Sequence, residues 1–118
     1  MKPATVNLTI YQGSTFIKEF QWKTGNPLVP VNITGYAIRM QIRENIKSQA
    51  VIIELSTTNG RISITDATNG FFVLNIAAVD TTTLDFKAGV YDLEMVSLLG
   101  IVTRLLDGSV SLSLEVTR

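Results

Sequence analysis

Hydroxyl, carboxylate and amine side chains are plentiful in this chain of 118 residues, but the side chains that usually activate them are missing. The sequence contains no His and no Cys. A serine nucleophile needs a base to accept its proton, and that base is normally His. Lys47 and Ser48 are adjacent, but no Ser-x-x-Lys spacing accompanies them. We interpret this pair as the solvated tip of a hairpin.

Two carboxylates, Asp92 and Glu94, are spaced to lie on the same face of one strand. Such a pair is able to act on a glycosidic bond or to hold Ca²⁺. It is also typical of the solvated face of an amphipathic strand, which is the interpretation we favour. The segment from Asp66 to Gly70 begins like a calcium loop but lacks its closing acidic residue, so we interpret it as a turn. With no glycine-rich phosphate loop either, we expect no enzymatic activity, no metal site and no cofactor.

An aromatic group near the N-terminus is the best candidate for a small-molecule surface. Phe16, Phe20 and Trp22 share one face of an expected strand, with Lys18 between them. Aromatic rings stack on sugars and bases, so one interpretation is a carbohydrate-binding surface. The other is ordinary packing of a strand against a core. No basic side chains surround the rings, which argues against nucleic acid.

The composition predicts a single domain over residues 1–118. Hydrophobic residues make up 46% of the chain, the mean hydropathy is +0.28, and 10 basic residues balance 10 acidic ones. Neutral, unclustered charge gives no footprint for nucleic acid or an anionic membrane. No apolar stretch approaches the length of a membrane span. The N-terminal residues lack the apolar core of a secretion signal, so we expect no export by that route.

Alternation of apolar and polar residues is the main structural signal. The alternating runs cover residues 6–10, 36–42, 51–55, 62–64, 72–76, 91–95 and 110–116, with a less regular run over 16–22. One buried and one solvated face is typical of antiparallel sheets. Many short strands separated by turns predict an all-β sandwich of about eight or nine strands, with a small barrel as the alternative.

Turn residues separate these runs. They lie at residues 13–14, 25–27, 34–35, 59–60, 69–70, 88–89, 99–100 and 107–108. Asn-Gly and Asp-Gly supply the positive φ that tight hairpins need. Polar residues 44–50 predict a longer hairpin loop. Residues 77–86 do not alternate, and Asp80 is a candidate N-cap for at most one short helical turn over residues 79–85.

The expected hairpin near the C-terminus is unusually apolar. It carries Leu98, Leu99, Ile101, Leu105 and Leu106, which are more apolar residues than one buried face requires. Either its sheet is covered on both sides, or a partner covers the remainder. The weakly charged last strand also favours addition of a strand from another chain.

The C-terminal run AGVYDLEMVSLLGIVTRLLDGSVSLSLEVTR resembles the end of small proteins encoded by tailed bacteriophages and prophages. The upstream runs ITGYAIRMQIRENIKSQAVIIEL and NGRISITDATNGFFVLNIAAVDTTTL extend the resemblance over residues 33–118. The family is the long-tail-fibre-connector-like β-sandwich, similar in style to N-terminal domains of phage baseplate upper proteins. The resemblance implies an immunoglobulin-like antiparallel sandwich, with Tyr91 and Asp92 as fold signatures and Arg104 as a surface contact. It implies no catalytic residues.

From this resemblance we expect a non-enzymatic virion protein, assembled in the host cytoplasm in multiple, symmetrically arranged copies. The favoured role is a tail-associated adaptor that joins or anchors fibre or baseplate components. The alternatives are a capsid decoration or head–tail joining protein and, in another class, a carbohydrate-binding module. We expect other virion proteins as partners and neither nucleic acid nor membrane. The candidate contact residues are Leu99, Ile101, Arg104 and Leu106 on the late hairpin and Arg39, Arg43 and Lys47 on the earlier one.

Overall fold

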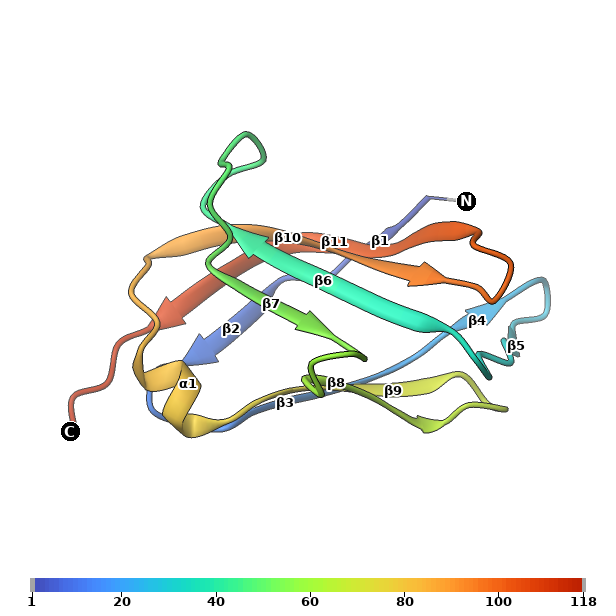
Figure 1. The fold of residues 1–118 in the computed structure, drawn as a ribbon, viewed down its shortest axis with the longest axis horizontal. Coiled ribbons are helices and arrows are strands. Elements are labelled where there is room, and N and C mark those ends of the chain that lie inside the picture. Colours follow the sequence, from blue (N-terminus) through green and yellow to red (C-terminus); the bar gives the residue numbers. More distant parts are fainter. Residues whose placement is uncertain (1, 118) are drawn as a thin grey trace.

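Two β-sheets packed face to face form the body of the protein (Figure 1), and the computed structural model describes residues 2–117. In chain order the elements are β1 (Ala4–Thr5), β2 (Leu8–Tyr11), β3 (Phe16–Gln21), β4 (Lys23–Thr24), β5 (Val29–Pro30), β6 (Ala37–Arg43), β7 (Ile53–Ser56), β8 (Ile62–Asp66), β9 (Phe71–Ile76), α1 (Ala78–Thr82), β10 (Ala88–Val96) and β11 (Val102–Ser113). The larger sheet runs β1-β11-β10-β6-β7, with β2 also paired to β11. The smaller sheet runs β3-β9-β8, and β4 and β5 form a separate hairpin.

The strand order is that of an immunoglobulin-like sandwich. The strands β11, β10 and β6 are neighbours in one sheet, while β3, β9 and β8 are neighbours in the other. This is the Greek-key arrangement of immunoglobulin domains, with β7 added beside β6. The N-terminal strands β1 and β2 lie parallel to β11. The all-β, immunoglobulin-like sandwich expected from the sequence is therefore confirmed.

The core lies between the sheets and follows the alternation in the sequence. It comprises Leu8, Ile10, Trp22, Ile33, Ile38, Met40, Ile42, Ile53, Leu55, Ile62, Phe72, Leu74, Ile76, Leu84, Phe86, Tyr91, Leu93, Met95, Leu106, Val110 and Leu112. Burial of each aliphatic side chain contributes about 1.5–3 kcal/mol, so this shared interior is the main stabilising term. The strand expected over residues 110–116 ends earlier than predicted. The strand β11 stops at Ser113 and leaves Leu114 and Val116 exposed.

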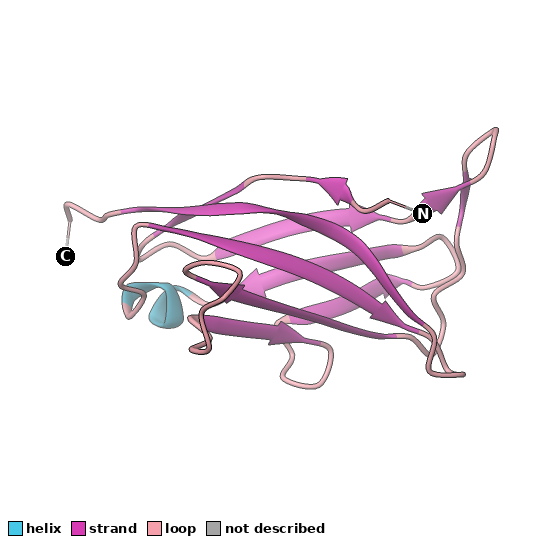
Figure 2. Cartoon of the chain, turned by 90° about the horizontal axis from the view of Figure 1, so that it is seen from above, coloured by secondary structure: helices cyan, strands magenta, loops and turns pink. Residues whose placement is uncertain are grey.

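The short helix forms where the alternation stops, as Figure 2 shows at one end of the sandwich. Its N-cap is Ala77 without a side-chain cap bond, so the expectation that Asp80 caps it is wrong. Thr81 holds the helix in place: its buried hydroxyl donates to the Ser14 carbonyl at 2.8 Å and accepts from the Gly13 N–H at 3.1 Å. In the described part of the chain, no helix has the length and apolar character needed to cross a membrane.

The strand count exceeds the expected eight or nine because three of the 11 described strands have two residues each. Most of the expected turns are present, at residues 13–14, 25–27, 34–35, 59–60, 69–70 and 99–100. Two expected turns are wrong. Residues 88–89 lie in β10 and residues 107–108 lie in β11, so residues 102–113 form one strand of 12 residues with no turn inside it.

Gly108 does not form a turn. It allows the N-terminal segment to pass close to β11. It lies opposite Tyr91, and a Cβ at this position would collide with the Val6 carbonyl. The N-terminal segment passes over this glycine between β1 and β2. Here the Tyr91 hydroxyl donates to the Val6 carbonyl at 2.7 Å, and the Ser109 N–H donates to Asn7 Oδ1 at 3.1 Å. A glycine inside a strand often marks such an approach, and its spacing alone does not distinguish this use from a turn.

Replacing Gly108 by Ala should lower the free energy of unfolding by about 1–3 kcal/mol, because the added methyl group forces the Val6 segment away from β11. Urea unfolding of the variant would measure this. Ser109→Ala is the control, because Ser109 is exposed and uses only its main-chain N–H in the crossing. Equal stability of the two variants would contradict the close passage of the Val6 segment over Gly108.

Burial raises the pKa of the Tyr91 hydroxyl to about 12, and the nearby Asp107 carboxylate adds to the shift. In the unfolded chain this hydroxyl ionises at the ordinary value of about 10, so between these values the unfolded state binds fewer protons than the folded state. Stability should therefore fall as the pH rises from about 10 to about 12. Tyr91→Phe should lack this component in urea unfolding measured at several pH values. Tyr11→Phe, which changes an exposed ring, should retain it.

Candidate functional site

The outer face of the larger sheet gathers most of the charged candidates. Arg39 and Arg43 lie on β6, Glu94 lies opposite Arg39 on β10, and Arg104 lies opposite Glu94 on β11. Asp92 lies two residues before Glu94 on the same face. The sequence separates these residues by up to 65 positions, and only the pairing of β6, β10 and β11 brings them together.

A β-bulge in β11 decides which side chains reach this face. Leu106 pairs with Leu93, but Arg104 pairs with Glu94, so Leu105 is an extra residue in the ladder. The bulge reverses the alternation at this point: Arg104 points outward, while Leu106 lies in the core. The expectation that Leu106 is a contact residue is therefore wrong, because the bulge turns its side chain into the core.

Asp92 and Glu94 are each paired with an arginine on this face. Glu94 Oε1 accepts from Arg39 Nε at 2.8 Å, and Asp92 Oδ2 lies 3.6 Å from Arg104 Nε. All four side chains are partly exposed. Their placement confirms the solvated-face interpretation of Asp92 and Glu94. In the described part of the chain, no three His, Cys, Asp or Glu side chains group as metal ligands would.

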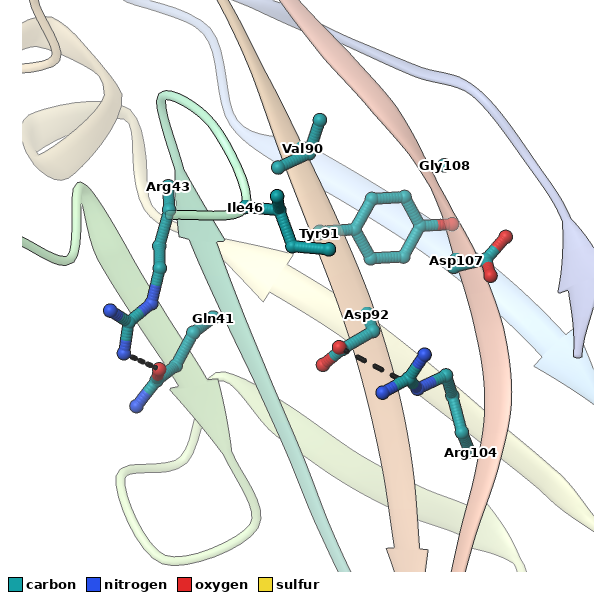
Figure 3. Close-up of a pocket in the computed structure, with 9 residues that line it drawn as sticks. All are labelled: Gln41, Arg43, Ile46, Val90, Tyr91, Asp92, Arg104, Asp107 and Gly108. Atoms are coloured by element: carbon teal, nitrogen blue, oxygen red, sulfur yellow. Dashed lines mark hydrogen bonds and ion pairs between the residues drawn. The ribbon is translucent and has the colours of Figure 1, made fainter. Parts of the chain in front are cut away.

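A groove of about 430 Å³ lies on the same face (Figure 3). It is lined by Gln41, Arg43, Ile46, Val90, Tyr91, Asp92, Arg104, Asp107 and Gly108. Arg43 is engaged within the chain, because its guanidinium donates to the Ser48 carbonyl at 2.7 Å and to Gln41 Oε1 at 2.7 Å. The bond to Ser48 ties the β6–β7 loop to the end of β6, and the bond to Gln41 orients the guanidinium on the sheet face. Arg43 thus has a structural role in addition to its place in the groove.

The candidates in the two hairpin loops lie apart from this face and from each other. Lys47 is exposed in the β6–β7 loop, whereas Leu99 and Ile101 are in the β10–β11 turn. Figure 1 shows that loop and that turn at separate places, with the turn at the end of the long strands. The strand register agrees, because Val90 beside Arg43 and Val96 beside the turn are at opposite ends of β10.

The β10–β11 turn carries an apolar cluster, which we call the hairpin tip and define as Leu98, Leu99, Ile101 and Val102. Their side chains are 79%, 89%, 64% and 48% exposed, respectively. The turn itself is ordered by main-chain bonds from Ser97 to Ile101 at 2.9 Å and from Gly100 to Ser97 at 2.9 Å. Val102 was missed as a candidate, although its alternation with Arg104 before the bulge was a usable signal.

The aromatic candidates do not form an open platform. Trp22 is only 8% exposed and packs edge-on against Tyr36, with ring centroids 5.9 Å apart. Phe20 stacks on the core residue Phe72 at 5.7 Å, and Phe16 is partly buried against the same core. Lys18 Nζ lies 5.9 Å from the Phe20 ring. These contacts support the core-packing interpretation and count against the carbohydrate-surface alternative, because alternation directs the rings inward.

No family model matches the chain, and no curated protein matches it. Among solved structures the chain is similar to murine CRIg, at 14% identity and a TM-score of 0.41, over 96% of this chain and 93% of that chain. It is also similar to a chain from work on T cell specificity and activation by the bacterial superantigen toxic shock syndrome toxin-1. There the identity is 12% and the TM-score 0.46, over 96% of this chain and 94% of that chain. Neither likeness carries an argument about binding.

Truncation should destabilise the fold much more at Leu106 than at Arg104, although the two residues are only two positions apart. Leu106→Ala removes buried methyl groups and should lower the free energy of unfolding by about 2–5 kcal/mol. Arg104→Ala removes an exposed ion pair and should cost no more than about 1 kcal/mol. Chemical denaturation of both variants tests the bulge. A larger loss in the Arg104 variant would mean that the register of β11 is misassigned.

Proposed function

We propose that the protein is a non-enzymatic structural component of a bacteriophage virion, acting as a tail-associated adaptor that joins or anchors fibre or baseplate components. The resemblance of residues 33–118 to long-tail-fibre-connector-like domains supplies the virion context. The mechanism is packing of complementary surfaces, assisted by pairing at an open strand edge. Its partners are other virion proteins.

The observation that carries this proposal is the hairpin tip. Leu98, Leu99 and Ile101 are each more than half exposed in one short turn. Contiguous exposed aliphatic side chains are costly to leave in water, and they are typical of surfaces that another protein covers. The tip is rigidly presented, because it lies at the end of the two longest strands.

The charge distribution supports a protein partner over a polyanion. Two of the three arginines that we place on the sheet face are matched by carboxylates, with Arg39 paired to Glu94 and Arg104 paired to Asp92. A surface of net neutral charge gives little long-range attraction to nucleic acid. It also gives little repulsion between copies packed at high local concentration.

Cross-linking mass spectrometry on purified phage particles tests whether the protein is part of the tail. Cross-links to tail, baseplate or fibre proteins are expected and would name the partner. Cross-links to the major capsid protein would overturn the adaptor role in favour of head decoration. Absence of the chain from intact particles would sink the virion proposal altogether.

The double variant Leu99→Ser, Ile101→Ser should weaken incorporation into particles at least about tenfold while leaving the isolated chain folded, because both side chains are exposed. Incorporation is measured by quantitative mass spectrometry and folding by thermal unfolding. Val79→Ser is the matched control, since Val79 is a 73% exposed aliphatic residue on α1, away from the tip. Unfolding of the double variant would show that the tip belongs to the core.

A further inference from the structure

The strand β3 presents an unpaired edge. It is the outermost strand of the smaller sheet and pairs only with β9 in the described chain. The Trp22 N–H donates to the Gly70 carbonyl at 3.0 Å, which continues the β3–β9 register as a hydrogen-bonded pair. Because such pairs alternate along an antiparallel ladder, the N–H and C=O groups of Ile17, Glu19 and Gln21 point away from β9.

The edge continues through β4. The Val31 N–H donates to the Trp22 carbonyl at 3.0 Å, and Thr24 pairs with Val29. These contacts put β5 on the same side as β9, so the main-chain groups of Lys23 also point outward. Outward main-chain groups that lack a strand partner among the described residues therefore continue from β3, across Trp22, to Lys23 of β4.

The free edge of β7 at the border of the larger sheet is closed, in contrast. The Ser56 N–H donates to Asn59 Oδ1 at 3.0 Å. The Glu54 carbonyl accepts from Asn59 Nδ2 at 2.8 Å and from Arg61 Nη1 at 3.0 Å. Side chains of the following turn thus occupy the positions that an added strand would need. Open edges template pairing with another chain, and no side chain of residues 2–117 covers the outward main-chain groups of β3 in this way.

We propose that the open edge of β3 and β4 binds the same edge of a second copy, antiparallel, around a two-fold axis through Gln21. In this register Glu19 of each copy lies opposite Lys23 of the other, which gives two pairs of opposite charge. Phe20 lies opposite Trp22 of the second copy on the inner side. Opposite charges and aromatic pairs directly across an antiparallel ladder are both favourable.

The neighbouring registers are disfavoured by charge. An axis through Lys18 places the two Lys18 side chains opposite each other, and an axis through Glu19 does the same for the two carboxylates. Like charges directly opposite each other destabilise a strand pair. An axis through Phe20 forms no ion pair, because it places Glu19 opposite Gln21. The axis through Gln21 alone combines outward main-chain groups with two matched pairs of charge.

Lys18 gives this edge its selectivity. It lies between Phe16 and Phe20 on the core-facing side of the edge strand, where inward-pointing charges discourage indiscriminate pairing. With the axis through Gln21, Lys18 lies opposite Thr24 of the second copy and meets no like charge. A single lysine therefore disfavours the register with its axis through Lys18 and is compatible with the register with its axis through Gln21, which makes the pairing specific.

A cysteine scan tests the register directly, because the chain contains no Cys of its own. Hydrogen-bonded residues opposite each other have Cα atoms about 5.5 Å apart, within reach of a disulfide. Under mild oxidation, Gln21→Cys should form a covalent dimer. Glu19→Cys should not, because its two thiols would lie about 13 Å apart along the ladder. A dimer from Glu19→Cys and none from Gln21→Cys would overturn the proposed axis.

A charge-swap cycle tests the ion pairs in solution. Glu19→Lys and Lys23→Glu should each weaken dimerisation at least about tenfold in analytical ultracentrifugation, because each single change sets like charges opposite each other twice. The double variant should restore association. Glu44→Lys and Lys87→Glu, which make the same charge changes at exposed sites off the edge, should leave it unchanged. A wild-type chain that stays monomeric at millimolar concentration would overturn the proposal.

This pairing does not depend on the virion role. It concerns the purified chain alone, and its experiments require no particle. Failure of the cysteine scan would leave the hairpin tip and its cross-linking test intact. Absence of the chain from particles would equally leave the edge pairing standing.

Discussion

The hydrogen bond from the Tyr91 hydroxyl to the Val6 carbonyl, made across Gly108, fixes which sheet receives the N-terminal strand. That segment is able to add to only one sheet at a time. Its close passage over β11 commits it to the larger sheet, where Asn7 completes the ladder at Ser109. The smaller sheet is consequently left with three strands and an open edge at β3. The path of the N-terminal segment along β11 therefore leaves the β3 edge of the other sheet available.

The β-bulge at Leu105 is the second feature on which the structure depends, because it reverses which side chains of β11 face the core. Before it, Val102 and Arg104 face outward; after it, Leu106, Val110 and Leu112 face the core. The bulge allows one strand to combine an exposed apolar end with a buried body. Figure 3 shows the outcome on the sheet face, where Arg104 reaches across to Asp92. Bulges re-aim side chains in this way where a strand must serve two environments.

The two candidate surfaces differ in the physics by which they bind. The hairpin tip offers exposed aliphatic area, which favours any complementary apolar partner and supplies affinity more than selectivity. The β3 edge offers main-chain hydrogen bonds, whose register is chosen by Glu19, Lys23 and Lys18. The tip is at the end of β10 and β11, and the edge belongs to the opposite sheet. Because they share no residue, a copy is able to engage both surfaces at once, as repeated assemblies require.

Sequence alone determined the sandwich, since alternation at residues such as Ile38, Met40 and Ile42 reports which face is buried. It also identified the apolar hairpin and the solvated strand face that Asp92 and Glu94 share. It did not determine that Gly108 lies inside a strand, because a glycine looks the same in sequence whether it forms a turn or lies beneath a crossing segment. It did not determine that Leu106 is buried, because the bulge that reverses the alternation depends on the pairing of β11 with β10. Tertiary structure decided those points, and with them the open edge of β3. The physical reason is that the register of β11 depends on its pairing with β10, and its crossing depends on contacts such as Asn7 with Ser109, 102 positions apart, and no local pattern encodes either.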